Sequence, residues 1–314
     1  MAAEQAPYVT LDVFSSERFK GNPVAIVNTN DVTLSQEEKQ RIAKEFNFSE
    51  TVFLHHPNQD EDPQISIFTP VNEMELAGHP VIGTGHYLFR QLRAKSDKAP
   101  GDLTMITKAG PVPISYNAAE DVVSANMTHN IRVHEKQATH SHIVPAQGSL
   151  QRAADLNGVA ETFPVVSMVK GVTYALVDLS GRPDLLDNLV PGPSPKLDLD
   201  DGWAPSFTGV MYYQRLGERS EDSALVWDLR VRMIAIDLED PACGSGSCSL
   251  SSFLALSRGQ EAKKHRFYIS QGAEMGRESH IIVEIELSED GSKVSTIKLA
   301  GQAAFVAEGK IFVR

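Results

Sequence analysis

The sequence EMELAGHP at residues 73–80 has a near copy, EDPACGSG, at residues 239–246, and this pair decides the fold. In each copy a glutamate stands four positions before a small residue, which is followed by glycine and a polar residue. Each copy follows a strand-like run, at residues 64–68 and 229–234, and opens a stretch that can form a helix. Backbone N–H groups at such a helix start can hold an anion. The repeat therefore predicts two similar halves around one small, carboxylate-bearing molecule.

The composition is that of an ordinary globular protein and excludes several classes. The chain has 314 residues, enough for two domains or one large one, with 41% hydrophobic and 22% charged residues. A net charge of -12 argues against a general nucleic-acid-binding surface. No apolar run approaches the roughly 18 residues of a membrane span, and the first residues lack the features of a secretory signal. We therefore expect a cytoplasmic protein, with no nucleic acid and no membrane as partner.

The two segments after the repeat are predicted to be buried helices, at residues 80–92 and 244–258. Neither has a charged face over its first ten residues. Pro80 is placed at the first helical position. Gly83 and Gly85 lie inside the first helix, where each costs roughly 1 kcal/mol relative to alanine. We therefore expect something to approach that backbone closely.

The repeat extends to a second pair of segments. FSETVFL at residues 48–54 resembles FTGVMYY at residues 207–213, and Glu50 of the first corresponds to Gly209 of the second. Strands are predicted at residues 8–14, 24–27 and 50–56. A capping box formed by Ser35 and Glu38 predicts a helix that ends near Phe46.

A polar stretch at about residues 117–150 carries four histidines, His129, His134, His140 and His142. Their spacing fits no compact ligand motif, and no cysteine lies nearby, so we expect no metal site. The two cysteines, Cys243 and Cys248, are five positions apart in one predicted helix, where they point away from each other. Both are expected to be free thiols.

At these motifs the chain resembles the phenazine-biosynthesis isomerase (PhzF-like) family, a branch of the diaminopimelate-epimerase-like proteins. The matching motifs occur in order along the chain: DVF at 12–14 with GNP at 21–23, NFSET at 47–51, AGHP at 77–80, EDPA at 239–242, QG at 271–272 with GR at 276–277, and GQA at 301–303.

The resemblance implies an α+β fold of two pseudo-symmetric domains, each a curved sheet wrapped around a central helix, with the active site in the cleft between them. We assign residues 1–118 with 300–314 to the first domain and 119–299 to the second. The family uses no organic cofactor or metal and often forms homodimers. Its implied partner is a small carboxylated substrate.

The resemblance also implies roles for site residues. Glu50 would move a proton between substrate carbons, and His79 and Asp240 would orient the substrate and assist that movement. Backbone donors near Gly78, Gly244 and Ser245 would hold the substrate carboxylate, beside Cys243. The racemase branch instead uses two thiols, at the positions of Ala77 and Cys243, and only the second is a cysteine here.

Simpler roles remain open for the same residues. Partial burial would raise the pKa of Glu50 into the range useful for acid–base chemistry, but Glu50 could be a polar residue at a strand edge. His79 could cap its helix, and Asp240 could close an Asx-turn. Cys243 at a helix start would have a lowered thiol pKa, or it could be a small buried side chain.

Three functions are therefore possible. The first is a cofactor-independent isomerase that moves a proton by acid–base catalysis. The second is a racemase or epimerase that uses Glu50 and Cys243 as its two bases. The third is a non-catalytic binding protein that keeps the fold.

Overall fold

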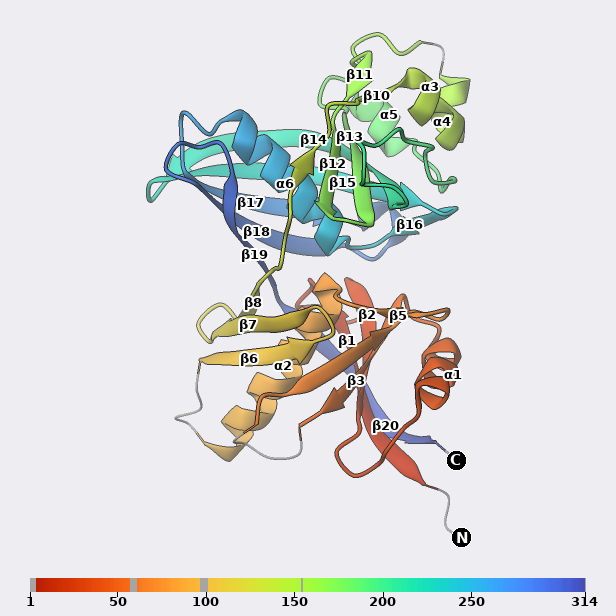
Figure 1. The fold of residues 1–314 in the computed structure, drawn as a ribbon, viewed down its shortest axis with the longest axis vertical. Coiled ribbons are helices and arrows are strands. Elements are labelled where there is room, and N and C mark those ends of the chain that lie inside the picture. Colours follow the sequence, from red (N-terminus) through yellow and green to blue (C-terminus); the bar gives the residue numbers. More distant parts are fainter. Residues whose placement is uncertain (1–3, 57–60, 97–100, 154, 314) are drawn as a thin grey trace. The chain divides into compact units, whose positions relative to one another are not determined.

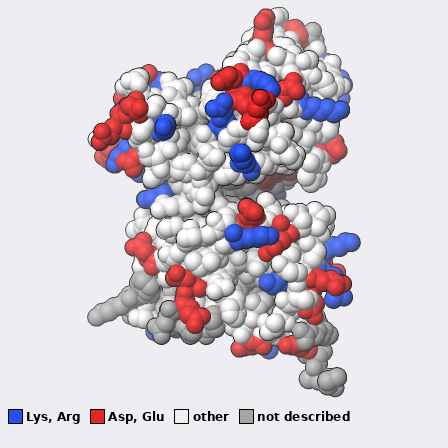
Figure 2. Space-filling view, in the orientation of Figure 1, with Lys and Arg blue, Asp and Glu red and all other residues white. Residues whose placement is uncertain are grey.

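The computed structural model describes residues 4–56, 61–96, 101–153 and 155–313 (Figure 1). Its internal contacts divide the chain into two compact units. Unit 1 comprises residues 1–128 and 300–314, and unit 2 comprises residues 129–299. None of the helices in the described ranges is both long and apolar enough to cross a membrane. On the face shown in Figure 2, basic side chains are scattered among acidic ones in each unit.

Unit 1 is built from strands and two helices. Its strands are β1 (Gln5–Val13), β2 (Asn22–Asn28), β3 (Glu50–His55), β4 (Gln64–Phe68), β5 (Glu73–Met74), β6 (Asp102–Thr107), β7 (Gly110–Asn117), β8 (Val122–Asn126) and β20 (Ala303–Phe312), and its helices are α1 (Gln36–Phe46) and α2 (Gly78–Lys95).

Unit 2 has more short elements. Its strands are β9 (Arg132–Val133), β10 (Ala138–Thr139), β11 (Thr162–Phe163), β12 (Val165–Val169), β13 (Val172–Asp178), β14 (Phe207–Glu221), β15 (Ala224–Ala235), β16 (Leu238–Asp240), β17 (Lys264–Gln271) and β18 (Ser279–Leu287), and β19 (Val294–Gly301) leads back to unit 1. Its helices are α3 (His140–Ile143), α4 (Gly148–Arg152), α5 (Pro183–Asp187) and α6 (Gly244–Ser257), with 3₁₀ turns at Val144–Ala146 and Ala273–Met275.

The two units share one strand topology. In unit 1, β1 is antiparallel to β2, β2 is parallel to β3, and β3 is antiparallel to β4. Strand β4 then pairs antiparallel with β5 and parallel with β6. In unit 2 the same sequence of pairings links β12, β13, β14, β15, β16 and β17. The repeat predicted from the sequence is therefore a repeat of the whole half, and α2 and α6 occupy equivalent places in it.

Helices α2 and α6 are the central helices of their units. Helix α2 contacts β1, β2, β3, β7 and β8, and α6 contacts β12, β13, β14, β17 and β18. Both are largely buried, as predicted. Helix α2 begins at Gly78, so the placement of Pro80 at its first position was wrong, and proline is its third residue. Proline is tolerated there because the first-turn N–H groups have no intrahelical partner.

The glycines of α2 are required by close packing. A Cβ atom on Gly83 would lie 2.9 Å from side-chain atoms of Val13 and Val24, and one on Gly85 would lie 2.7 Å from Val123. The expectation of a close neighbour is confirmed, because the strands approach this helix within a distance that leaves no room for a methyl group.

Helix α1 covers the other face of the unit 1 sheet. The capping box is present, because the Ser35 hydroxyl accepts from the Glu38 N–H while the Glu38 carboxylate accepts from Ser35. The apolar side of α1 packs on Phe53 and Phe68, whose rings meet edge to face at 5.4 Å. Because β3 alternates its side chains, Phe53 lies on the face opposite to Glu50.

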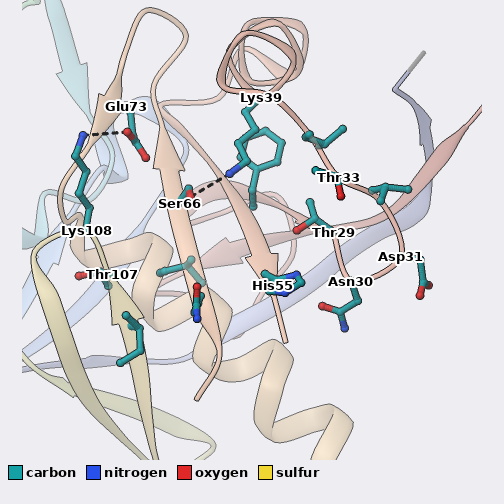
Figure 3. Close-up of a pocket in the computed structure, with 16 residues that line it drawn as sticks. Thr29, Asn30, Asp31, Thr33, Lys39, His55, Ser66, Glu73, Thr107 and Lys108 are labelled. Carbon is teal, nitrogen blue, oxygen red and sulfur yellow. Dashed lines mark hydrogen bonds and ion pairs between the residues drawn. The ribbon is translucent and has the colours of Figure 1, made fainter. Parts of the chain in front are cut away.

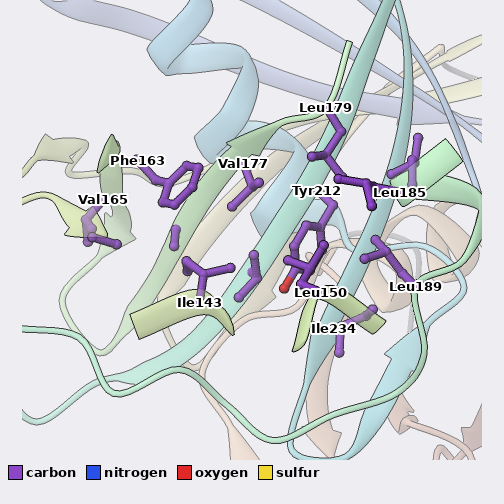
Figure 4. Close-up of a cluster of buried hydrophobic side chains, with 14 residues drawn as sticks. Ile143, Leu150, Phe163, Val165, Val177, Leu179, Leu185, Leu189, Tyr212 and Ile234 are labelled. Carbon is purple, nitrogen blue, oxygen red and sulfur yellow. The ribbon is translucent and has the colours of Figure 1, made fainter. Parts of the chain in front are cut away.

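Unit 2 has a second core between its sheet and the short helices (Figure 4). Ile143 of α3, Leu150 of α4 and Leu185 of α5 pack against Val177 and Tyr212 of the sheet. This cluster covers the side of β13 and β14 that faces away from α6, so these two strands are packed on both faces.

Candidate active site

In unit 1 the structure brings together Glu50 and His79, two of the predicted site residues. Glu50 is the first residue of β3, and His79 is the second residue of α2. The carboxylate atom Oε2 of Glu50 lies 3.4 Å from Nε2 of His79, and both atoms are shielded from solvent. Ala77 begins the helix without a side-chain cap, and the N–H of Gly78 has no acceptor among the described residues. The Gly78 N–H at this helix start is therefore not used by the described residues.

Glu50 is held in a dry environment. Its side chain is 15% exposed, and burial raises the pKa of this carboxyl above its ordinary value, while a hydrogen bond from Ser49 opposes the shift. Ser49 is in turn fixed by Asn22, 3.2 Å away. The expected rise in the pKa of Glu50 is confirmed. A carboxylate whose pKa is raised by desolvation is a stronger base than one in water.

In unit 2 the equivalent helix start carries Cys243, Gly244 and Ser245. Cys243 is the N-cap of α6, and its Sγ accepts a hydrogen bond from the Gly246 N–H at 3.3 Å. No acceptor among the described residues takes the N–H of Gly244 or of Ser245. Two backbone donors at the positive end of a helix form a site for an anion.

The expectation of a lowered pKa for the Cys243 thiol was wrong. Cys243 is 4% exposed, and burial, with the negative field of Asp240 added, raises the pKa of its thiol to about 12. The rise in the thiol pKa caused by desolvation thus exceeds the decrease that the positive end of the helix would cause by itself. Cys243 and Cys248 are both free thiols, as predicted, and both are buried. At neutral pH the Cys243 thiol is protonated.

Tyr174 completes this half of the site, and sequence analysis missed it. Its hydroxyl lies 2.7 Å from the Ser245 hydroxyl and 3.4 Å from Cys243 Sγ. Tyr174 pairs in register with Gly209, just as Val24 pairs with Glu50 in unit 1. A Cβ on Gly209 would be 3.1 Å from the Tyr174 ring.

The glycine that replaces Glu50 in the repeat therefore makes room for a tyrosine. Burial keeps the pKa of Tyr174 well above its ordinary value, so this residue is a neutral phenol. The sequence feature that could have pointed to Tyr174 was Gly209, which has no side chain at the position where the first half of the repeat has Glu50. The structure thus places a phenol where the first half has a carboxylate.

Asp240 and Gln271 shape the turn that leads into α6. Asp240 Oδ1 accepts from the Ala242 N–H at 2.9 Å, which is the Asx-turn considered above. The buried Gln271 spans the turn, since its Nε2 donates to the Asp240 carbonyl at 2.7 Å and its Oε1 accepts from the Cys243 N–H at 3.2 Å. Gln271 belongs to a family motif noted above. Its amide fixes Asp240 relative to the helix start.

The repeated glutamates that open both copies of the motif have structural partners. Glu239 forms a buried bidentate ion pair with Arg232, at 2.8 and 2.6 Å. Glu73 pairs with Lys108 at 2.9 Å. Both glutamates hold the short strand before the helix against its neighbours.

The histidines of unit 2 do not form a metal centre in the described part of the chain, where no three His, Cys, Asp or Glu side chains come together as ligands. His134 contacts Ser167 at 2.8 Å, His140 contacts the Ala160 carbonyl at 2.7 Å, and His142 accepts from the Thr139 N–H. These contacts give the histidines structural roles.

The whole chain has clear relatives. Residues 11–309 match the family described as phenazine biosynthesis-like protein. The trans-2,3-dihydro-3-hydroxyanthranilate isomerase of Pseudomonas aeruginosa is 33% identical over 307 residues, which cover 98% of this chain and 99% of that protein.

Two solved structures show the same fold. A Bacillus anthracis phenazine biosynthesis protein of the PhzF family has a TM-score of 0.70 and 20% identity, covering 98% of this chain and 99% of that one. A hydroxyproline epimerase from Agrobacterium vitis, with bound trans-4-hydroxy-L-proline, has a TM-score of 0.57 and 14% identity, covering 98% and 92%.

The relatives identify this chain as an isomerase. The solved structures show that it has the diaminopimelate-epimerase-like fold, with two pseudo-symmetric α+β halves. More narrowly, the chain belongs to the phenazine biosynthesis-like (PhzF) family.

Proposed function

We propose that this isomerase moves a proton between two carbons of a small carboxylate-bearing substrate, without a cofactor, and that Glu50 is its base. The observation that carries the proposal is the desolvated Glu50 carboxyl, with a raised pKa, held 3.4 Å from His79. A carbon acid beside a conjugated system loses its proton slowly in water, and a positioned carboxylate base accelerates that step.

The reaction is balanced without a redox partner. The Glu50 carboxylate takes a proton from one carbon, and the electron pair of that C–H bond moves into the adjacent π-system. The double bond shifts, and the protonated Glu50 returns the proton to the carbon at the far end. His79 orients the carboxyl group during both transfers.

The substrate carboxylate is assigned to the start of α6. The N–H groups of Gly244 and Ser245 and the Ser245 hydroxyl are the donors, and Asp240 orients the polar groups of the substrate beside them. The N–H of Gly78 is a further donor in unit 1. This assignment requires both half-sites to act on one molecule in a cleft between the units, as the family resemblance implies.

A single base favours isomerisation over epimerisation. Inversion at one carbon needs a second base on the opposite face, and the candidate, Cys243, has a thiol pKa of about 12. Gly209 stands where a second glutamate would be. With one carboxylate that both removes and returns the proton, the outcome is a shift along the substrate.

The name of one relative supports a proposal for the substrate class. A relative with 33% identity is named for its action on trans-2,3-dihydro-3-hydroxyanthranilate. We infer a cyclic carboxylic acid of similar size with an acidic C–H bond next to a conjugated system.

The test uses trans-2,3-dihydro-3-hydroxyanthranilate as the probe, in deuterated water, with NMR and mass spectrometry of the product. The native protein should shift the double bond and incorporate deuterium at one carbon. Glu50→Gln should abolish turnover and retain binding, while Glu45→Gln, on the exposed side of α1, should leave the rate unchanged. Cys243→Ser should retain substantial activity.

A reversed pattern would contradict the proposal. An active Glu50→Gln variant together with an inactive Cys243→Ser variant would move the chain to the racemase and epimerase class. Binding of the probe with no deuterium exchange in the native protein would favour a non-catalytic role.

A further inference from the structure

Unit 1 contains a cavity on the opposite face of β3 from Glu50; Figure 3 shows the residues that line it. Its volume is about 560 Å³, which is within the range of small-molecule sites. Phe53 and His55 of β3 and Gln64 and Ser66 of β4 lie on its sheet face, where His55 pairs in register with Gln64 and Phe53 with Ser66. Helix α1 contributes Lys39. Because strands alternate their side chains, this cavity is separate from the Glu50 carboxyl.

Within the described part of the chain, Lys39 forms no ion pair. Its Nζ lies 3.3 Å from the neutral Ser66 hydroxyl and 5.9 Å from the centre of the Phe53 ring. Among the described residues no carboxylate comes within 4 Å of this ammonium group. Glu73, whose field acts on Lys39, is bound by Lys108 at 2.9 Å (Figure 3) and also accepts from the side-chain amide of Gln36 at 3.3 Å.

The position of Lys39 is electrostatically unfavourable for a cation. It lies in the first turn of α1, where the helix dipole is positive. It is half-buried, and desolvation lowers the pKa of its ammonium group, with only partial compensation from the field of Glu73. The chain thus holds a partly desolvated positive charge next to an open cavity without neutralising it.

Further donors face the same space. The side chains of His55 and Gln64 make no hydrogen bond with other described residues, and both line the cavity beside Ser66. Val32, Leu34 and the ring of Phe53 supply apolar walls. The combination of one ammonium group without a carboxylate partner, neutral donors and apolar surface suits a ligand with an anionic head and an apolar body.

The charge balance selects the ligand. Of the two lysines in the lining, Lys108 is paired with Glu73 at 2.9 Å, and the lining also carries the carboxylate of Asp31, so a dianion such as phosphate would meet one available cation together with a further negative charge. A monoanion needs only the one cation that has no carboxylate partner. We propose that this cavity is a binding site for a small organic carboxylate, distinct from the Glu50 site and independent of the reaction proposed above.

The experiment is a titration of the full-length protein with sodium benzoate, followed by TROSY NMR of the backbone amides. Benzoate should shift the amides of His55, Gln64 and Ser66. Lys39→Met should weaken the binding measured at these amides by at least about tenfold, as expected for loss of a charge-assisted contact. Lys44→Met, on an exposed position of the same helix, is the matched control and should bind as the native protein does. Inorganic phosphate should produce weaker shifts than benzoate.

A second variant distinguishes binding in this cavity from binding at the start of α6. Ser245→Ala should leave the shifts at His55, Gln64 and Ser66 unchanged, whatever its effect on turnover. Thermal unfolding of Lys39→Met should show an intact fold, because the change removes an unpaired half-buried charge, and Lys39→Gln provides a second polar replacement. Benzoate shifts confined to the start of α6, equal binding by Lys39→Met and native protein, or stronger binding of phosphate would each overturn the proposal.

Discussion

The Tyr174 hydroxyl lies 2.7 Å from the Ser245 hydroxyl in unit 2, and this pair is the counterpart of the Glu50–His79 pair in unit 1. His79 and Ser245 are both the second residue of a central helix. In each unit an ionisable side chain from the two parallel strands reaches that residue. The two halves therefore share a geometry and differ in chemistry: a base with a raised pKa in one, and a neutral hydrogen-bond donor in the other.

Tyr174→Phe tests whether this phenol positions Ser245. A phenol that holds the Ser245 hydroxyl should orient it toward the substrate carboxylate, so its loss should raise KM more than it lowers kcat. The free energy of unfolding should fall by only about 1 kcal/mol, the usual net value of one hydrogen bond. Steady-state kinetics and urea denaturation measure the two effects.

The control for Tyr174 is Tyr213→Phe, which removes a second buried phenol from the neighbouring strand β14. It should change stability by a similar amount and leave KM unchanged. If both variants alter KM equally, Tyr174 has only a structural role.

The raised pKa of Glu50 predicts a particular pH dependence of stability. The native state holds this proton to higher pH than the unfolded chain does. Between the ordinary carboxyl pKa and the raised native one, the native state binds more protons, so the free energy of unfolding falls as pH rises. Above that window the buried carboxylate costs stability. Glu50→Gln should therefore be more stable than the native protein at pH 7, and less pH-dependent across the window.

Urea denaturation at several pH values would measure this effect. The same raised pKa should appear in kcat/KM, which should increase with pH as Glu50 loses its proton. A Glu50→Gln protein with lower stability at pH 7 would mean that the carboxylate is stabilised by its site rather than desolvated.

The thiols should be unreactive in the folded protein. Cys243 and Cys248 are buried and have raised thiol pKa values, about 12 for Cys243. Since the thiolate is the reactive form, a disulfide-exchange reagent at pH 7 should label neither residue rapidly, and it should label both after denaturation without reductant. Rapid labelling of one thiol in the native protein would instead indicate an accessible, activated Cys243.

Much of the fold was predictable because its signals are local or repeated. The capping box of Ser35 and Glu38 lies within four residues, and the central helices follow from the duplicated motif. Gly83 indicated a close neighbour because glycine in a helix interior is otherwise costly. Such features depend on short stretches of sequence, which is why they could be predicted without knowing the packing.

The parts of the site that could not be predicted depend on burial and register. The helix-start position of Cys243 favoured a low thiol pKa, but the degree of desolvation that reverses it arises from the packing of several elements. Tyr174 reaches Ser245 only because β13 and β14 pair with Tyr174 opposite Gly209. That register depends on pairing between strands far apart in the sequence, and no local motif in this chain predicts it.

The buried ion pair between Arg232 and Glu239 should control the strand that leads into the site. Both side chains are 4% exposed, and Arg232 also donates to the Leu186 carbonyl at 2.9 Å. Removing one charge leaves the other buried and unpaired, which typically costs about 3–5 kcal/mol. Glu239→Gln should therefore lower the free energy of unfolding by about this amount, as measured in urea.

A double variant distinguishes the effect of losing the ion pair from the effect of leaving one charge buried without its partner. Arg232→Met combined with Glu239→Leu removes both charges and leaves apolar groups, so it should be more stable than either single variant. If β16 needs the ion pair to set the Asx-turn of Asp240, the double variant should still show reduced turnover despite its recovered stability. Stability losses that simply add in the double variant would show that the two side chains do not act as a pair.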